Sequence, residues 1–238
     1  MTLRCKIVDL GEILERLKAG SDPDSLAGMA RVGISTSDAF GVKVPVLRAI
    51  AGEAGKDHDL ASELWKHGWR ETRILAGMID DPKVVTEEQM DSWVSGFRDW
   101  EVCDQACMNL FERTPFAYSK AIEWSSSDEE FVKRAGYVMM ARLAVGKKGV
   151  DDDGLAAFLP LIVRGADDER NMVKKGVNWA LRQIGKRNLY LNKMAIGTGE
   201  EIATIESMSA RWIASDALRE LRSAEVQERL SERARRTR

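Results

Sequence analysis

Hydrophobic positions recur mostly every three or four residues along this chain, which is the spacing of one face of an α-helix. Strict alternation of polar and apolar residues between tight turns, typical of β-hairpins, is nearly absent. The pattern predicts an all-α protein with helices near residues 8–20, 23–32, 44–54, 58–66, 70–80, 87–97, 100–112, 116–123, 128–144, 153–163, 168–185, 199–205, 209–222 and 224–235.

Prolines and polar clusters mark several of the predicted helix starts. Pro45, Pro82 and Pro115 fall at or shortly before such starts, where a missing backbone N–H costs little. The serines and aspartate of 125–128, followed by two glutamates, form a favourable N-cap sequence. No low-complexity linker divides the chain, so we expect a single domain, 1–238.

Two short segments suggest an internal repeat. Residues 132–136 resemble residues 173–177 at an offset of 41. Helix pairs at this spacing are typical of HEAT-type units, which stack into a curved superhelical array. The two matches are short, so a plain helical bundle is the alternative.

Composition limits the class of protein. With 238 residues, 44% of them hydrophobic and 31% charged, the chain suits a folded protein rather than a disordered one. Its apolar runs are too short to span a bilayer, and its first residues lack a secretory signal pattern. We therefore expect a cytoplasmic protein, in a bacterium also nucleoid-accessible, that makes no membrane contact.

Cysteine and histidine are too few for several kinds of site. Cys5, Cys103 and Cys107 form no paired framework, and the last two read as small buried residues. With only two histidines in the chain, these cysteines assemble no zinc site. The scarcity of histidine also argues against a Ser-His-Asp triad.

Positive charge is concentrated in one part of a weakly acidic chain. The net charge is −2, but residues 131–193 hold thirteen Lys and Arg against six acids, a local charge of +7 that leaves −9 elsewhere. Because phosphates respond to local potential, such a region can bind a polyanion. Arg134 opens this region in the same repeat frame as Lys175, and it is either a phosphate contact or a solvated arginine.

The predicted helix that covers residues 172–187 has two different faces. At 100° per residue, its apolar residues gather on one side, and Lys175, Trp179, Arg182 and Lys186 gather on the other. Cations beside an outward indole suit a DNA backbone, because the charge binds phosphates and the flat ring contacts a sugar or base. The alternative is that Trp179 packs under a neighbouring helix.

An aspartate and a tryptophan share one face of another predicted helix. Asp104 follows Trp100 by four residues, and Cys103, Ala106 and Leu110 form the adjacent apolar stripe. DNA repels carboxylates, so a carboxylate on a DNA-binding surface indicates that this group has a function there. A carboxylate can stabilise the oxocarbenium character that develops when a glycosidic bond breaks. The alternative is an ordinary aspartate on the surface or in the first helical turn.

Five segments together resemble the AlkD-like family of DNA alkylation-repair glycosylases. The resemblance covers nearly the whole chain, and the motifs are specific as an ordered set rather than singly. They are Phe40-Gly41-Val42-Lys43-Val44-Pro45-Val46-Leu47-Arg48, Trp100-Glu101-Val102-Cys103-Asp104, Phe131-Val132-Lys133-Arg134, Lys174-Lys175-Gly176-Val177-Asn178-Trp179-Ala180-Leu181-Arg182 and Ala210-Arg211-Trp212-Ile213-Ala214-Ser215-Asp216-Ala217-Leu218-Arg219-Glu220-Leu221.

The resemblance implies a curved array of antiparallel HEAT-like helix pairs that grips duplex DNA on a basic concave face. It implies excision of N3- and N7-alkylated purines without a base-flipping pocket, by a monomer that needs neither metal nor organic cofactor. Carried over by motif, Asp104 resembles the catalytic aspartate, Trp100 and Trp179 resemble the sugar-packing tryptophans, and Arg134 resembles the backbone-contacting arginine. The other expected phosphate contacts are Lys133, Lys174, Lys175, Arg182 and Lys186.

One position departs from the family pattern. The better-studied members carry a tyrosine where this chain has Val32. This departure removes an aromatic or hydroxyl contact and puts the substrate range and rate in doubt, while Asp104 is retained.

Two other functions therefore remain alternatives. A non-catalytic protein of the same fold could bind damaged or branched DNA. A HEAT array could also serve as a protein-interaction scaffold, which would bind DNA negligibly even at low salt.

Overall fold

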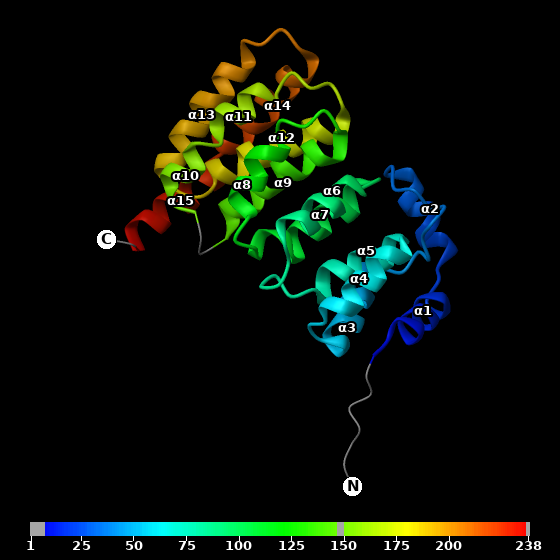
Figure 1. The fold of residues 1–238 in the computed structure, drawn as a ribbon. Coiled ribbons are helices and arrows are strands. Elements are labelled where there is room, and N and C mark those ends of the chain that lie inside the picture. The colour runs from blue at the N-terminus through cyan, green and yellow to red at the C-terminus, as the bar shows by residue number, and fades with distance from the viewer. Residues whose placement is uncertain (1–7, 147–149, 237–238) are drawn as a thin grey trace. The chain divides into compact units, whose positions relative to one another are not determined.

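The computed structural model describes residues 8–146 and 150–236, and every regular element in these ranges is a helix (Figure 1). The predicted all-α class is confirmed. The chain divides into two compact units, Met1–Thr114 and Pro115–Arg238, and each is described here by itself. Compact units within a repeat array are not necessarily separate domains, so the expectation of a single domain stays a prediction.

The first unit is built around α5. This helix packs against α3, α4 and α7, and its Gly77 lets α7 approach closely, because a Cβ there would lie 3.4 Å from the Cα of Ala106. The helices of the unit are α1 (Leu10–Ala19), α2 (Pro23–Arg31), α3 (Val44–Ala54), α4 (His58–His67), α5 (Arg70–Ile79), α6 (Glu87–Ser95) and α7 (Trp100–Asn109), followed by the 3₁₀ turn η1 (Phe111–Arg113).

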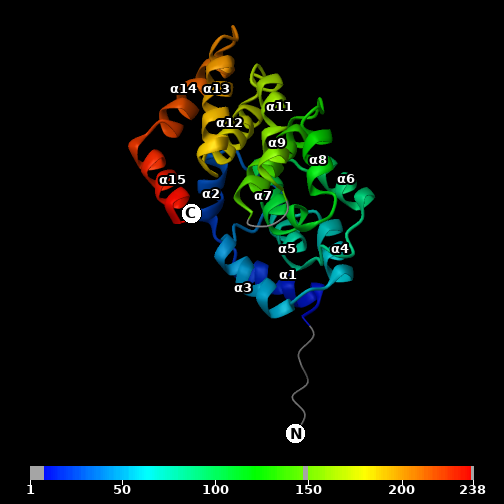
Figure 2. The ribbon, with the colours of Figure 1, turned by 90° about the vertical axis from the view of Figure 1, so that its left-hand side faces the viewer.

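The second unit has two layers of helices (Figure 2). In one layer α12 packs between α9 and α14; in the other, α8 packs on α9, α11 on α12 and α13 on α14. The repeated segments 132–136 and 173–177 lie near the starts of the adjacent helices α9 and α12, as expected for stacked repeats. The helices are α8 (Ala117–Trp124), α9 (Glu130–Val145), α10 (Asp152–Ala156), α11 (Leu159–Arg164), α12 (Asn171–Gly185), α13 (Leu189–Ala203), α14 (Met208–Leu221) and α15 (Ala224–Arg236).

Two predicted helices were wrong in extent. The helix expected over 153–163 is interrupted after Ala156, and Pro160 lies in the first turn of the second piece. The helix expected over 199–205 is α13, which begins ten residues earlier, where the Asn188 side chain caps it by accepting from the Leu191 N–H. Its glycines interrupt the hydrophobic spacing, so the first part of this helix was not predicted. Gly199 allows α13 to pack closely on α14, because a Cβ there would lie 2.9 Å from the Leu218 side chain.

None of the helices in the described ranges combines the length and the apolar character that a membrane span needs.

Gly136 is required where α9 crosses the end of α8. A Cβ at this position would lie 2.4 Å from the backbone nitrogen of Ser125, and backbone cannot rotate aside. We expect Gly136→Ala to lower the free energy of unfolding by about 3 kcal/mol, as measured by urea denaturation. At Gly197 in α13 nothing lies within 4 Å of an added Cβ. Gly197→Ala should therefore raise stability by about 0.5–1 kcal/mol, and equal effects of the two substitutions would contradict this account.

Candidate nucleic-acid interface

The start of α7 places Trp100 and Asp104 on one side of that helix. The Asp99 carboxylate caps the helix by accepting from the backbone N–H groups of Glu101 and Val102, at 2.9 and 3.0 Å. Trp100 is therefore the first helical residue, and Asp104 follows one turn later. The neighbouring Cys103 and Cys107 are buried, as predicted. Asp104 is 8% exposed, which argues against an ordinary surface aspartate.

Trp100 is half-buried and linked to the position that departs from the family pattern. Its Nε1–H donates to the Val32 carbonyl oxygen at 3.1 Å. Val32 ends α2, and its side chain is 54% exposed. Val32 and Trp100 also line the same recess of the first unit.

A recess of about 370 Å³ lies beside Trp100 within the first unit. It is formed by residues from α2, the start of α3 and the starts of α5 and α7, and its walls combine apolar groups with the lysine side chain of Lys43. The lining residues are Ser25, Gly28, Met29, Val32, Ile34, Lys43, Val44, Arg70, Trp100 and Glu101. The recess can accept a small, partly apolar group such as a sugar ring.

A buried glutamate holds the loop that precedes α3. Glu71 accepts from the backbone N–H groups of Phe40, Gly41 and Val42 at 2.9, 3.0 and 3.1 Å. Gly41 has φ +82°, and a Cβ there would lie 2.5 Å from a backbone oxygen, so only glycine suits it. The sequence marked this loop as a motif but gave no sign that Glu71 anchors it.

Arg70 joins that glutamate to the helix that carries Trp100. Its Nη1 donates to Glu71 at 2.7 Å and its Nε donates to Glu101 at 2.9 Å. Because Glu101 follows Trp100 directly, this buried pairing ties the position of α7 to the loop that lines the recess.

The apolar face of α12 in the second unit is as predicted. The apolar stripe, which consists of Val173, Val177, Ala180, Leu181 and Ile184, is fully buried. Lys175 is exposed, and within residues 8–146 and 150–236 its side chain makes no hydrogen bond or ion pair. Trp179 is half-buried, a state between the predicted outward position and the alternative of packing under a neighbour.

The other cations on this face pair with carboxylates of α14. Lys186 donates to Glu220 at 2.7 Å, and Arg182 bonds both Glu220 and Asp216. Burial tends to raise the pKa of Glu220, but the hydrogen bonds from Arg182 and Lys186 outweigh it and lower that pKa below its ordinary value. Phosphates would therefore share these two cations with acids that are already bound to them.

Lys133 and Arg134 connect α9 to the start of α12. Lys133 donates to Asp168 at 3.0 Å, and Arg134, which is 6% exposed, donates to the Met172 carbonyl at 2.7 Å. Both side chains thus contribute to the packing of adjacent repeats. Sequence periodicity could not reveal this, because the partners lie 35 and 38 residues away. Their assignment to DNA phosphates stays a prediction.

Asp168 should make stability depend on pH. Hydrogen bonds from Arg170, followed by Lys133, hold the pKa of its carboxyl well below the ordinary value against the opposing effect of burial. In the unfolded chain an aspartate has a pKa of about 4. A pKa that is lower in the folded state adds stability that is fully present above that pH and is lost as the pH falls below it. We expect Asp168→Asn to be less stable than wild type at pH 7, with a smaller difference at pH 3, by chemical denaturation.

The exposed neighbour Asp167 provides the control for this experiment. Asp167→Asn should stay within about 0.5 kcal/mol of wild type at pH 7. A loss in Asp168→Asn that is the same at both pH values would contradict the assigned role.

An exposed tryptophan beside a lysine was not among the predicted site residues. Trp212 on α14 is 41% exposed, and the Lys174 ammonium lies 5.2 Å from its ring centroid. This cation–π pair presents a flat ring and a charge on one surface. The tryptophan lay within a motif quoted from the sequence, but only the packing of α12 beside α14 brings the pair together.

The predicted site residues fall into two sets. Trp100 and Asp104 lie on α7 of the first unit, and the others lie on α9 and α12 of the second, where they are close to one another. Among the described residues, His, Cys, Asp and Glu form no group of three or more that could hold a metal ion.

Comparison with known proteins identifies relatives of this chain. A solved structure described as a new family of proteins related to the HEAT-like repeat DNA glycosylases, with affinity for branched DNA structures, superposes with a TM-score of 0.76 at 19% identity, covering 88% of this chain and 94% of that one. This likeness confirms the HEAT-like-repeat fold.

Two further solved structures share less. An engineered protein superposes with a TM-score of 0.44 at 16% identity, covering 94% of this chain and 100% of that chain. A designed armadillo repeat protein gives 0.38 at 17% identity, covering 91% of this chain and 96% of that one. No curated protein sequence matches this one. The model of the DNA alkylation repair enzyme family matches residues 13–221, and the chain therefore belongs to that family.

Proposed function

We propose that this protein is a DNA glycosylase that excises N3- and N7-alkylated purines from duplex DNA and leaves an abasic site. The observation that carries the proposal is the nearly buried Asp104 carboxylate, one turn after Trp100, in a chain of the DNA alkylation repair enzyme family. A carboxylate that is mostly shielded from water interacts more strongly with positive charge that develops close to it than an exposed carboxylate does.

The chemistry needs little beyond charge stabilisation. An N-alkylated purine is already cationic, so the C1′–N bond can break with its electron pair leaving on a neutral base. Asp104 stabilises the oxocarbenium ion that remains and orients a water, which adds to C1′ and loses its proton to solvent. Trp100 and Trp179 pack against the deoxyribose with their π faces, which also favour a cationic sugar. Neither a general acid nor a metal takes part.

Phosphate binding falls to the cations of the second unit. Lys175 is exposed, and Lys174 lies over the face of Trp212, so both can meet phosphates directly. Arg182 and Lys186 would do so by exchanging part of their contact with Glu220. Lys133 and Arg134 complete the proposed set from α9. The protein acts on DNA as a monomer in this proposal.

The proposal is tested with a duplex that carries a single N7-methylguanine. After incubation with purified protein, alkaline treatment cuts the strand wherever an abasic site has formed. Scission at the lesion supports the glycosylase, and absence of scission at enzyme excess overturns it.

A second candidate is a non-catalytic protein that binds branched or damaged DNA. Two points favour it: the affinity for branched DNA described for the related structure, and the valine at position 32, next to Trp100, where the family pattern has a tyrosine. It predicts tighter binding to a four-way junction than to a duplex of equal length, without scission of alkylated DNA.

A further inference from the structure

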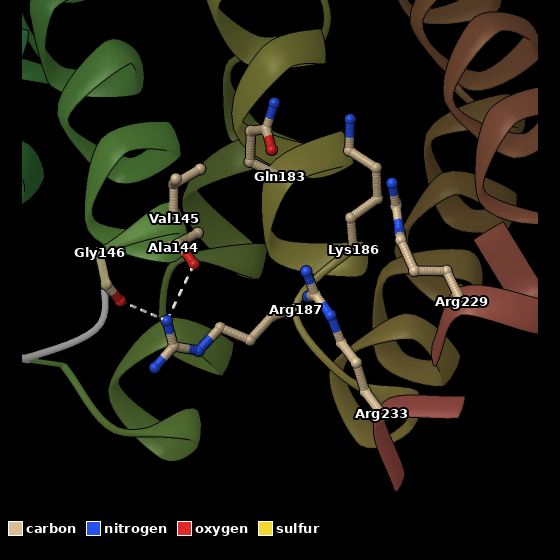
Figure 3. A pocket seen from close by; sticks show the side chains of 8 residues that line it. All are labelled: Ala144, Val145, Gly146, Gln183, Lys186, Arg187, Arg229 and Arg233. Atoms are coloured by element: carbon tan, nitrogen blue, oxygen red, sulfur yellow. Dashed lines mark hydrogen bonds between the residues drawn. The ribbon is translucent and has the colours of Figure 1, made fainter. Parts of the chain in front are cut away.

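The second unit contains a pocket of about 970 Å³ that shares only Lys186 with the predicted site residues (Figure 3). It is formed by the end of α9, the end of α12 and one face of α15, and four of its eight lining residues are cations. Among the residues that the structure describes, none of those lining it is acidic. The lining residues are Ala144, Val145, Gly146, Gln183, Lys186, Arg187, Arg229 and Arg233.

Arg187 and Lys186 are held in place by partners within the fold. Arg187 closes the end of α9, because its Nη1 donates to the carbonyl oxygens of Ala144 and Gly146 at 3.0 and 2.6 Å. Figure 3 shows both bonds. These contacts offset the negative end of the α9 dipole, which would otherwise repel an anion. Lys186 shares Glu220 with Arg182, so one carboxylate serves two positive charges.

Arg229 and Arg233 come from α15, and their spacing of four residues places them on the same side of that helix. Figure 3 shows their side chains extending beside that of Lys186. The Nε of Arg229 is buried and has no hydrogen-bond partner in the structure. A buried donor left without a partner costs about 1–3 kcal/mol, so its presence points to a ligand that satisfies it.

The chemistry of the pocket selects an anion with several oxygen acceptors. Arginines bind phosphate through two parallel N–H donors, and the volume exceeds what a single phosphate would fill. A run of phosphates along a nucleic-acid backbone meets both requirements.

Resting on the proposed function, we propose that this pocket, through Arg229 and Arg233 of α15 together with Lys186, binds the sugar–phosphate backbone of DNA as a second contact outside the catalytic residues. The contact is independent of base sequence and of the lesion, because arginine–phosphate bonds read only the backbone. It adds affinity without touching the bond that breaks.

The experiment compares the full chain with two double variants on the same helix. Arg229→Gln/Arg233→Gln removes two charges from the pocket, and Arg235→Gln/Arg236→Gln removes two exposed charges of α15 that do not line it. Binding to an unmodified duplex is measured by fluorescence anisotropy over a range of salt concentrations. We expect the pocket variant to bind at least about tenfold more weakly at low salt and to lose about two units of salt slope, and the control variant to stay near wild type.

The outcomes separate this proposal from the proposed function. Equal affinities and salt slopes for the two double variants would overturn the pocket contact, even if excision of N7-methylguanine persists. Loss of affinity confined to the pocket variant would support it, even if the wild type excises nothing.

Two further measurements keep the test decisive. If thermal unfolding shows that the double variant is misfolded, Arg233→Gln alone replaces it, because that side chain is exposed. We expect it to lose about one unit of salt slope.

Inorganic phosphate alone is tested by its effect on the melting temperature at constant ionic strength. Stabilisation by phosphate that the pocket variant loses, with unchanged DNA affinity, would indicate a site for free phosphate and would overturn a DNA contact.

Discussion

Replacing Asp104 with asparagine is expected to slow excision of N7-methylguanine by at least about tenfold, because the variant lacks the charge that stabilises the cationic sugar. Asparagine has nearly the same shape, so the packing around the second turn of α7 should survive. DNA affinity should fall little, since a carboxylate contributes nothing favourable to phosphate binding. The rate is measured under single-turnover conditions, so that product release does not mask the chemical step.

The matched control is Asp59→Asn, which removes an exposed carboxylate from α4 of the same unit. It should excise at the wild-type rate. Melting temperatures of both variants establish that they are folded. Undiminished excision by a folded Asp104→Asn protein would refute the proposed mechanism, even though the protein would still be a glycosylase.

Truncating Glu71 to alanine should have the largest effect on stability. The substitution leaves three backbone N–H groups without their acceptor and Arg70 without one of its two carboxylate partners, all in a buried site. Removing one partner of a buried ion pair costs about 3–5 kcal/mol. For a chain of this size that corresponds to a fall in melting temperature of roughly 10 °C. Differential scanning calorimetry measures it.

The exposed Glu63 on α4 offers the control for this substitution. Glu63→Ala should change the free energy of unfolding by less than about 0.5 kcal/mol. If Glu71→Ala melts as the control does, the buried network does not hold the loop before α3.

Much of the local structure was predictable because it depends on residues close in the chain. The apolar stripe of α12 is buried as its spacing indicated, and α3 begins at Val44 with Pro45 in its first turn. The first ten residues of α13 were not predicted, because glycines at 197 and 199 obscure the spacing, and at 199 the packing against Leu218 decides the residue.

The candidate site was predictable in its residues but not in their contacts. Trp100 and Asp104 share a helical face as their spacing required. The predicted phosphate contacts Arg182, Lys186 and Lys133 proved to be bonded to carboxylates, and Arg134 to a backbone carbonyl. A count of charges along the sequence cannot show which opposite charges later lie beside them.

By itself the sequence determined the helical class, most helix positions, the buried face of α12 and the family, because periodicity, capping and motifs are local or ordered properties of the chain. Only the tertiary structure decided that Glu71 anchors the loop before α3, that Lys174 meets Trp212, and that Arg229 and Arg233 line a pocket with Lys186. Those contacts join residues about 30 to 47 positions apart, and such pairs are set by how helices pack rather than by the pattern within any one of them.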